Sequence, residues 1–364
     1  MQKQNNYLYS RIKQEILEYV KDLPLNSRIP TRTELVEKFG VTRTTIDRAI
    51  SELIGEGYFY SRVGSGTYLI KNKGTEGPRP DNSNWGIILP SITTDTYPEI
   101  IRAVEDICSE SGINLIICNT DNNVEKQEKY IKQLADSNVS GIVIVPAIGR
   151  PLEARKGFEI LKENNISFVF CNRGVEGFDA PKVVSNDFYG GNIATRHLFA
   201  NGWKRPAFIS KPFYTISEQR YNGYLNALYE HCIPFDEKLI RFEDRFDIKN
   251  SGYELMKSLL ELAEPPDSVF CFNDVVAAGA YMAIEEKRKK VGVDIGVVGY
   301  DDSRICESLS TKLTSVRFPK YEIGKRAAEI LLRIILGEEI EENYSIVMQP
   351  ELVIRESCGE KRGK

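Results

Sequence analysis

The sequence predicts an α/β protein built from a small helical head and a larger body of two lobes, each a doubly wound parallel sheet. Three observations support this. Residues 1–70 hold three amphipathic helical stretches and a final alternating stretch. A segment rich in Gly, Pro and charge follows, and from residue 85 short apolar runs alternate with amphipathic stretches. Continuously apolar strands separated by helices are typical of parallel sheets covered on both faces.

The composition is that of a globular protein of two or three domains: 364 residues, 41% of them hydrophobic and 27% charged. The net charge of −4 is unevenly spread. Residues 1–73 hold 12 Lys and Arg against 8 Asp and Glu, and the remaining residues hold 36 against 44. A basic head on an acidic body indicates a nucleic-acid-binding module joined to another domain, although a surplus of four charges also arises by chance.

The head begins with a helix predicted over residues 7–21, where apolar side chains recur at helical spacing. In "IPTRTEL", Thr31 is the expected N-cap of a second helix and Glu34 completes a capping box. That helix is expected to end at Gly40, and a third begins at Thr42. Two short helices around a glycine turn are typical of a helix-turn-helix.

The alternating stretch "GYFYSRVGSGTYLI" then predicts two strands around a hairpin tip without bulky side chains. Three segments in order, "PTRTEL", "VTRTTI" and "GSGT", resemble the winged helix-turn-helix of GntR-family regulators. The resemblance covers residues 7–70 and implies that the third helix enters the major groove of double-stranded DNA while the wing tip approaches the minor groove. The candidate DNA contacts are Arg32, Thr33, Thr42, Arg43, Thr44, Thr45, Asp47, Arg48, Arg62, Gly64, Ser65 and Gly66.

Asp47 and Thr33 depart from that family, which usually carries Arg at the first position and often Arg or Asn at the second. The operator sequence therefore cannot be copied from relatives. Asp47 has two possible roles. It could accept a hydrogen bond from a cytosine amino group, or it could pair with Arg43 four residues earlier on the helix. The pairing role is the simpler one and is slightly preferred.

Residues 71–84, "KNKGTEGPRPDNSN", are predicted to be a linker, and residues 85–364 to form the two-lobed body. Seven apolar runs are expected strands: "WGIILP", "INLIICN", "GIVIVP", "ISFVFCN", "RPAFIS", "DSVFCF" and "IGVVGY". The expected helices between them are Tyr97–Ser111, Val124–Ser137, Leu152–Asn164, Tyr189–Ala200, Glu218–His231 and Ile248–Leu262. About ten strand candidates favour two linked lobes over one very wide sheet.

Catalytic motifs are lacking: the sequence has no G-x-x-x-x-G-K-[ST], no G-x-S-x-G and no G-x-G-x-x-G after a strand. Its two histidines, His197 and His231, fall in expected helices without neighbouring metal ligands. The seven cysteines form no C-x-x-C pair and are expected to be buried free thiols. We therefore expect no metal, no cofactor and no enzymatic activity.

Polar residues instead gather where the expected strands end: Asn119, Asp121, Asn172, Arg173, Asn273, Asp274, Asp301 and Asp302. In open α/β sheets, ligands bind outside the carboxyl ends of the strands. Amides, carboxylates and arginines near aromatic side chains suit a polyhydroxylated ring. The alternative is that these residues are only turn and N-cap residues, and this is preferred for Asp121 and Asp302.

Residues 85–356 resemble the sensor domain of LacI/GalR-type repressors, which is related to periplasmic sugar-binding proteins. The segments that carry the resemblance are "VVSNDFYGGNIATRHLFANGWKRPAFI", "SEQRYNGYLNAL", "VFCFNDVVAAGAYMAI", "IGVVGYDDS" and "LTSVRFPKYEIGKRAAEILL". The resemblance implies effector contacts at Tyr97, Asn172, Arg173, Arg220, Asn273, Asp301 and Phe318. Asn172 stands where Asp is common, and Phe318 replaces a frequent Gln, which favours stacking over hydrogen bonding.

A GntR-type head on a LacI-type body resembles the bacterial arabinose repressors. This implies a homodimer that binds a two-fold operator and is released by a monosaccharide, with arabinose as the first candidate. Three alternatives stay open: an activator or sugar-phosphate sensor of the same architecture, a sugar-metabolising enzyme with a DNA-binding head, and a transport-type binding protein. The stretch "MQKQNNYLYSRIKQEI" lacks the apolar region of a secretory signal, and no apolar run is long enough to cross a membrane, so we expect a cytoplasmic protein.

Overall fold

The computed structural model describes residues 2–21, 23–24, 27–55, 58–62, 66–69, 84–149, 151–243 and 251–359. The chain divides into two compact units, Met1–Ser83 and Asn84–Lys364. Residues 71–83 of the predicted linker lie outside the described residues. No helix in the described part of the chain is long and apolar enough to cross a membrane.

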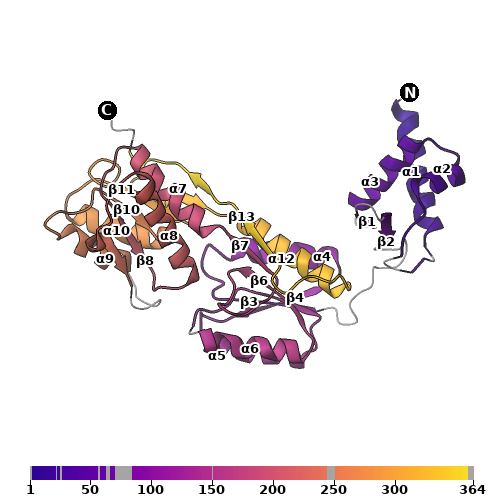
Figure 1. Ribbon diagram of the computed structural model, residues 1–364, viewed down its shortest axis with the longest axis horizontal. Coiled ribbons are helices and arrows are strands. Elements are labelled where there is room, and N and C mark those ends of the chain that lie inside the picture. Colours follow the sequence, from indigo (N-terminus) through magenta and orange to yellow (C-terminus); the bar gives the residue numbers. More distant parts are fainter. Residues whose placement is uncertain are drawn as a thin grey trace. The chain divides into compact units, whose positions relative to one another are not determined.

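Within its described residues, the N-terminal unit contains three helices and a two-stranded antiparallel hairpin (Figure 1). Its elements are α1 (Gln2–Tyr19), α2 (Arg32–Phe39), α3 (Arg43–Gly55), β1 (Phe59–Arg62) and β2 (Gly66–Leu69). The predicted capping box is present, since Thr31 and the side chain of Glu34 bond each other's backbone groups. Gly40 ends α2 in the left-handed conformation, with a φ of 62°, which favours glycine because it has no Cβ. The predicted winged helix-turn-helix is confirmed.

The apolar stripe of α3 holds this unit together. Ile46, Ile50 and Leu53 on α3 are fully buried, and they share one core with side chains of α1, α2 and the hairpin. Burying one side of α3 leaves its polar residues, with Arg43 and Arg48 among them, on the exposed side. The amphipathic pattern of this short helix therefore fixes which of its side chains can meet DNA.

The first lobe of the larger unit is a six-stranded parallel sheet in the order β13-β7-β6-β5-β3-β4. Its strands are β3 (Asn84–Leu89), β4 (Asn114–Asn119), β5 (Gly141–Ile144), β6 (Ser167–Asn172), β7 (Lys182–Ser185) and β13 (Ser345–Met348). Its helices are α4 (Pro98–Glu110), α5 (Val124–Asp136), α6 (Pro151–Glu163) and α12 (Lys320–Ile335). Helices α5 and α6 cover one face of the sheet, and α4 and α12 cover the other (Figure 1).

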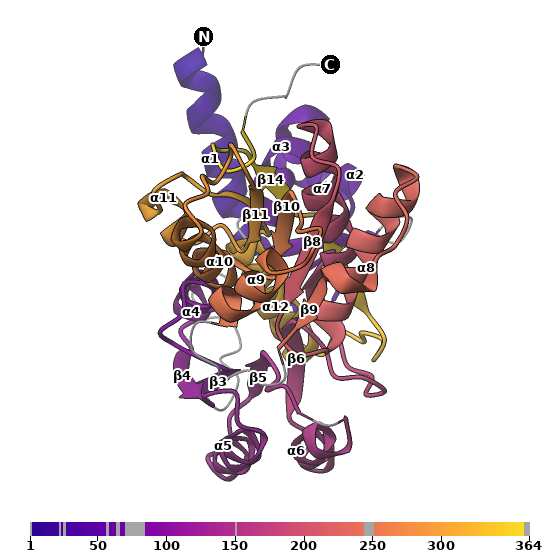
Figure 2. The same cartoon turned by 90° about the vertical axis from the view of Figure 1, so that its left-hand side faces the viewer.

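The second lobe holds a six-stranded sheet in the order β14-β12-β11-β10-β8-β9, with β14 antiparallel to β12 and the other pairs parallel. Its strands are β8 (Pro206–Ser210), β9 (Ile240–Phe242), β10 (Ser268–Cys271), β11 (Gly296–Tyr300), β12 (Thr314–Arg317) and β14 (Glu351–Val353). Its helical segments are α7 (Asp187–Ala200), α8 (Thr215–Glu230), η1 (Glu237–Leu239), α9 (Ser251–Leu260), α10 (Asp274–Glu286) and α11 (Ile305–Ser308). Helices α7 and α8 lie on one side of this sheet, and α9 and α10 on the other (Figure 2).

The chain passes between the lobes three times: from β7 to α7, from β12 to α12, and from β13 to β14. All seven apolar runs expected to be strands are strands, and each lobe is doubly wound as predicted. Six of the seven cysteines are buried free thiols, whereas Cys232 is exposed, contrary to expectation, because it lies in the turn that follows α8.

Candidate functional site

A cavity of about 420 Å³ lies where the two lobes face each other, at the carboxyl ends of their parallel strands. All seven predicted effector contacts line it: Tyr97, Asn172, Arg173, Arg220, Asn273, Asp301 and Phe318. Tyr97, Asn172 and Arg173 form what we call the first-lobe wall, and Arg220, Asn273 and Asp301 the second-lobe wall. Phe318 joins them from the passage between β12 and α12. The fold thus collects residues that are up to 221 positions apart, from Tyr97 to Phe318.

Arg220 is the centre of the second-lobe wall. Its side chain is buried, and its Nε donates to Oδ1 of Asp187 at 2.8 Å. Its Nη1 donates to the carbonyl oxygen of Phe272 at 2.5 Å, and its Nη2 lies 3.8 Å from Oδ1 of Asp301. The guanidinium also lies over the ring of Tyr300, 3.4 Å from its centroid. A charge this deeply buried needs such partners, and here two carboxylates provide them.

Two glycines make the contact between Arg220 and Asp187 possible. A Cβ on Gly191 of α7 would lie 2.2 Å from the carbonyl oxygen of Arg220, and a Cβ on Gly223 of α8 would lie 2.1 Å from that of Phe188. Both distances are far too short for a side chain. Glycine at these two positions therefore lets α7 and α8 pack backbone against backbone, which brings the start of α7 to the guanidinium.

The first-lobe wall is less completely paired. Arg173 is 7% exposed, and its Nε donates to the carbonyl oxygen of Pro146 at 2.7 Å. Its Nη1 lies 3.5 Å from the hydroxyl of Tyr97, but its Nη2 is buried and contacts no acceptor among the described residues. No carboxylate of the described chain pairs with this guanidinium. Arg173 is thus a buried cation with one unused donor at the cavity.

Three strand ends aim polar residues at the cavity. Asn172, the last residue of β6, and Asp301, the residue after β11, adopt positive φ angles of 66° and 97°. Such backbone strain is often found at binding sites. Asn273 begins α10, and its side-chain oxygen accepts from the backbone N–H of Val276 at 3.0 Å. Asn273 therefore serves as the N-cap that the alternative interpretation predicted and also lines the cavity.

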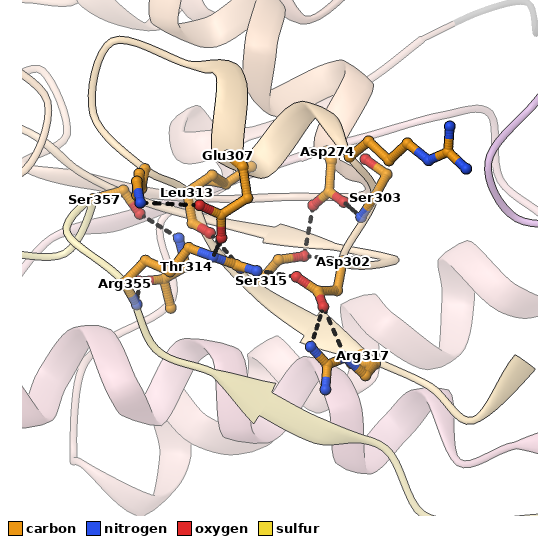
Figure 3. A network of polar contacts seen from close by, with 12 residues as sticks. Asp274, Asp302, Ser303, Glu307, Leu313, Thr314, Ser315, Arg317, Arg355 and Ser357 are labelled. Carbon is orange, nitrogen blue, oxygen red and sulfur yellow. Dashed lines mark hydrogen bonds and ion pairs between the residues drawn. The ribbon is translucent and has the colours of Figure 1, made fainter.

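A network of polar contacts surrounds Asp274 and Asp302 (Figure 3), and two of its members, Asp274 and Ser303, line the cavity. The buried carboxylate of Asp274 accepts from the backbone N–H of Ser303 at 2.7 Å and from the hydroxyl of Ser315 at 2.5 Å. Asp302 pairs with Arg317 and with Arg355, at 2.6 and 2.8 Å. These contacts tie the loop after β11, which carries Asp301, to strand β12 and to the segment that follows β14.

Burial changes the acidity of the carboxyls around Arg220. Burial raises the pKa of Asp301 to about 7, and the nearby guanidinium of Arg220 limits the rise. Burial also raises the pKa of Asp187, again opposed by Arg220, and that of Asp274, opposed by its hydrogen bonds. Asp301 and Asp187 share Arg220, and of these two carboxylates only Asp301 lines the cavity.

The structure also corrects the weight given to individual residues. Asp187, which is absent from the predicted contacts, pairs with Arg220, and its place two residues after the β7 strand was the available signal. Asn119 does not line the cavity, and its side chain donates to Asp121 at 2.8 Å. Asp121, for which the turn interpretation was preferred, also lies outside the cavity and accepts from Lys126 at 2.6 Å. No group of three His, Cys, Asp or Glu side chains suited to a metal ion occurs within the described residues.

In the N-terminal unit, Asp47 lies between two arginines. Its carboxylate oxygens are 3.8 Å from Nε of Arg43 and 3.6 Å from Nε of Arg32, so the pairing expected from the sequence is present. Arg32 also donates to the hydroxyl of Thr67 on β2 and thereby links α2 to the hairpin. The side chain of Arg43 is 78% exposed.

The other predicted DNA contacts divide into described and undescribed residues. Thr33, Thr44 and Arg48 are exposed, and the hydroxyls of Thr42 and Thr45 lie 2.9 Å apart at the start of α3. Arg48 lies 3.7 Å from Glu52, and Gly66 begins β2. The side chain of Arg62 and the wing-tip residues Gly64 and Ser65 lie outside the described residues.

Two family models match the chain. "Bacterial regulatory proteins, gntR family" covers residues 6–69, and "Periplasmic binding protein-like domain" covers residues 195–358. An arabinose metabolism transcriptional repressor of Geobacillus stearothermophilus is 28% identical over 97% of this chain and 98% of its own length. An HTH-type transcriptional repressor PurR of Actinobacillus pleuropneumoniae is 33% identical over 75% of this chain and 80% of its own length.

Solved structures resemble the larger unit. The transcription regulator CcpA of Lactococcus lactis is 30% identical, with a TM-score of 0.68, over 76% of this chain and 99% of its own. A LacI family transcriptional regulator of Enterococcus faecium with bound ribose is also 30% identical, with a TM-score of 0.64, over 77% of this chain and 100% of its own. These relatives are regulators of transcription, in agreement with the prediction that the chain is not an enzyme. The chain belongs to the family of bacterial transcriptional regulators that have a LacI-type sensor domain, and it carries a GntR-type DNA-binding domain at its N-terminus.

Proposed function

We propose that this regulator is a repressor that binds a two-fold operator as a homodimer and leaves it when a sugar occupies the cavity between the lobes. The observation that carries the proposal is the convergence of seven polar and aromatic residues around one cavity of about 420 Å³. A volume of this order suits a small ligand. Two similar proteins support the proposal, since one is an arabinose metabolism transcriptional repressor and the other is a LacI family regulator with bound ribose.

In the proposed complex, the second-lobe wall binds hydroxyls of the sugar. Asp301 accepts hydrogen bonds from hydroxyl groups, while the Arg220 guanidinium, already held by Asp187, is a fixed donor. Asn172 and Arg173 bind the sugar from the first lobe. Tyr97 and Phe318 contribute aromatic rings that cover its apolar face. Because the contacts come from both lobes, sugar binding favours the arrangement in which the lobes lie closest together.

On the DNA side, α3 is proposed to enter the major groove. Its exposed Arg43 would contact phosphate or a guanine edge, and the threonines at its start would bind backbone oxygens. Arg32 is already bonded to Thr67 and paired with Asp47, so we assign it mainly to holding α2 against the wing. Since the partner is operator DNA, we place the protein in the bacterial cytoplasm.

Exposed apolar side chains support the homodimer. On α10, Val275 and Met282 are 66% and 55% exposed and lie two helical turns apart on one face. On the edge strand β4, Ile116 and Ile117 are 37% and 50% exposed. Val275 also lines the cavity. A dimer contact through α10 would therefore sense closure around the sugar, which couples the sugar site to the spacing of the two DNA-binding heads.

Operator binding measured with and without a panel of monosaccharides and disaccharides, arabinose first, tests the function. We expect one sugar to lower operator affinity and to raise the melting temperature; if no sugar changes either quantity, the proposal is wrong. If the sugar instead raises operator affinity, the sugar strengthens DNA binding and does not release the protein from its operator. In the same assay, Arg43→Ala should weaken operator binding by about 1–3 kcal/mol, the value of a bidentate base contact.

The oligomeric state is tested separately by sedimentation of Met282→Asp and Ile117→Asp. A charge placed in either apolar contact should shift the protein toward the monomer, whereas Val293→Asp, an equally exposed apolar residue on the loop before β11, should not. If all three variants sediment like the parent protein, these two surfaces do not form the dimer.

A further inference from the structure

A second cavity of about 370 Å³ adjoins the first and shares Arg173 and Tyr214 with it. It is lined by the loop after β5 (146–149), the loop after β6 (173–176) and the start of α8 with the residues before it (213–218). Both cavities therefore open at the carboxyl ends of the strands. A ligand that fills the first cavity can therefore extend past Arg173 into the second cavity.

Arg173 is built for a ligand at this junction. Its Nε and Nη1 are held by Pro146 and Tyr97, so the guanidinium has a defined orientation. Its Nη2 is buried and contacts no acceptor among the described residues. Buried donors in proteins nearly always have partners, which indicates that a ligand oxygen supplies the missing one.

The chemistry of the second cavity favours a neutral hydroxylated ring. Glu176 and Glu218 offer carboxylates, and Thr215 offers a hydroxyl. Phe213 lines the cavity, is 61% exposed and packs edge-on against Phe242. Two carboxylates outnumber the single guanidinium, so an anionic group would be repelled. Carboxylates that accept from hydroxyls, beside an exposed aromatic face, suit a sugar ring instead.

We propose that the effector is a disaccharide or larger glycoside, with one sugar unit in the first cavity and the next in the second. The oxygen that links the two units, or a hydroxyl beside it, accepts from Nη2 of Arg173. This inference rests on the proposed function, in that the first cavity binds a sugar. It adds that a single monosaccharide uses only part of the site.

Calorimetric titration of the full-length protein tests this, with maltose, cellobiose, lactose and arabinobiose against glucose, galactose and arabinose. We expect one disaccharide to bind at least about tenfold more tightly than its component monosaccharides. Phe213→Ala and Glu218→Gln should each remove most of that gain while leaving monosaccharide affinity unchanged. Phe235→Ala provides the matched control, because Phe235 is 54% exposed and lines neither cavity.

The outcomes separate this inference from the function on which it rests. If a monosaccharide binds as tightly as every disaccharide, or if the two variants weaken both classes equally, the second cavity is not a sugar subsite, although the sugar-sensor function stands. If no saccharide binds, the proposed function itself fails. Tighter binding of a sugar phosphate than of any neutral sugar, lost in Arg173→Gln, would overturn the inference in favour of an anionic effector.

Discussion

The two walls of the cavity differ in how completely their arginines are paired. In the second lobe, Arg220 has Asp187 at 2.8 Å, a backbone carbonyl and the Asp301 carboxylate. In the first lobe, Arg173 has neutral acceptors on two nitrogens and none on the third. One guanidinium is therefore part of the folded structure, and the other is held ready for a ligand. The difference teaches that a ligand-binding arginine can also be part of the folded structure, as Arg220 is, whereas Arg173 keeps one nitrogen for the ligand alone.

Removal of Arg220 should have the largest effect. In Arg220→Met, Asp187 and Asp301 lose their shared cation inside the second lobe, and breaking a buried pair typically costs about 3–5 kcal/mol. We expect a fall of that size in the free energy of unfolding, measured by urea denaturation, together with loss of the sugar response.

The double variant Arg220→Met with Asp187→Asn is the control for this effect. It removes one of the uncompensated carboxylates and should recover part of the lost stability without recovering the sugar response. Full stability in Arg220→Met alone would show that this arginine is not a structural element, and the contrast between the walls would disappear.

The corresponding change in the first lobe, Arg173→Gln, should act more on binding than on stability. It removes no paired carboxylate, so the free energy of unfolding should fall by no more than about 1.5–3 kcal/mol, the value of a hydrogen bond with one charged partner, and by less than in Arg220→Met. Effector affinity should fall by about 10- to 100-fold, because a charged hydrogen bond to the ligand is lost. A stability loss equal to that of Arg220→Met would mean that both arginines are structural.

The acidity of Asp301 gives a test of intermediate size. Its pKa is raised to about 7 by burial, so this group favours the folded state while protonated, and its contribution is lost as pH rises from about 4 to about 7. The pH dependence of effector binding has the opposite sign, because the ionised carboxylate of Asp301 accepts hydrogen bonds from hydroxyl groups better than the protonated form does. Effector affinity should rise about tenfold between pH 6 and pH 8. Titration calorimetry of Asp301→Asn should show no such rise; a rise that persists would assign it to another group.

How much of this could be read from the sequence depends on distance along the chain. The capping box at Thr31 and the strand runs are local patterns, and the structure has them where expected. The collection of Asn172, Asn273 and Asp301 at one cavity followed from the rule that parallel strands end together. The ion pair between Asp187 and Arg220 could not be predicted from the sequence, because these residues meet only through the close packing of α7 on α8. The unpaired nitrogen of Arg173 likewise depends on neighbours that no local pattern contains.

The smallest effect is expected where the arrangement around Arg220 recurs on an exposed surface. In the N-terminal unit, Asp47 lies 3.8 Å from Arg43 and 3.6 Å from Arg32, with a side chain that is 49% exposed. Asp47 between two arginines mirrors Arg220 between two carboxylates, but solvent screens the charges around Asp47 because they are exposed. Exposed pairs of this kind contribute about 0.3–0.5 kcal/mol. Asp47→Asn should therefore change the unfolding free energy by no more than that amount.

Its effect on DNA separates the two roles of Asp47. If the carboxylate only holds Arg43, Asp47→Asn frees that arginine and removes a negative charge near the phosphates, so affinity should rise a few-fold for every operator sequence alike. If Asp47 reads a cytosine, selection from randomised operators should instead lose preference at one base pair, by about 1–3 kcal/mol. We expect the uniform rise, because in the structure the carboxylate already lies within ion-pair distance of both arginines and a cytosine amino group would have to compete with them.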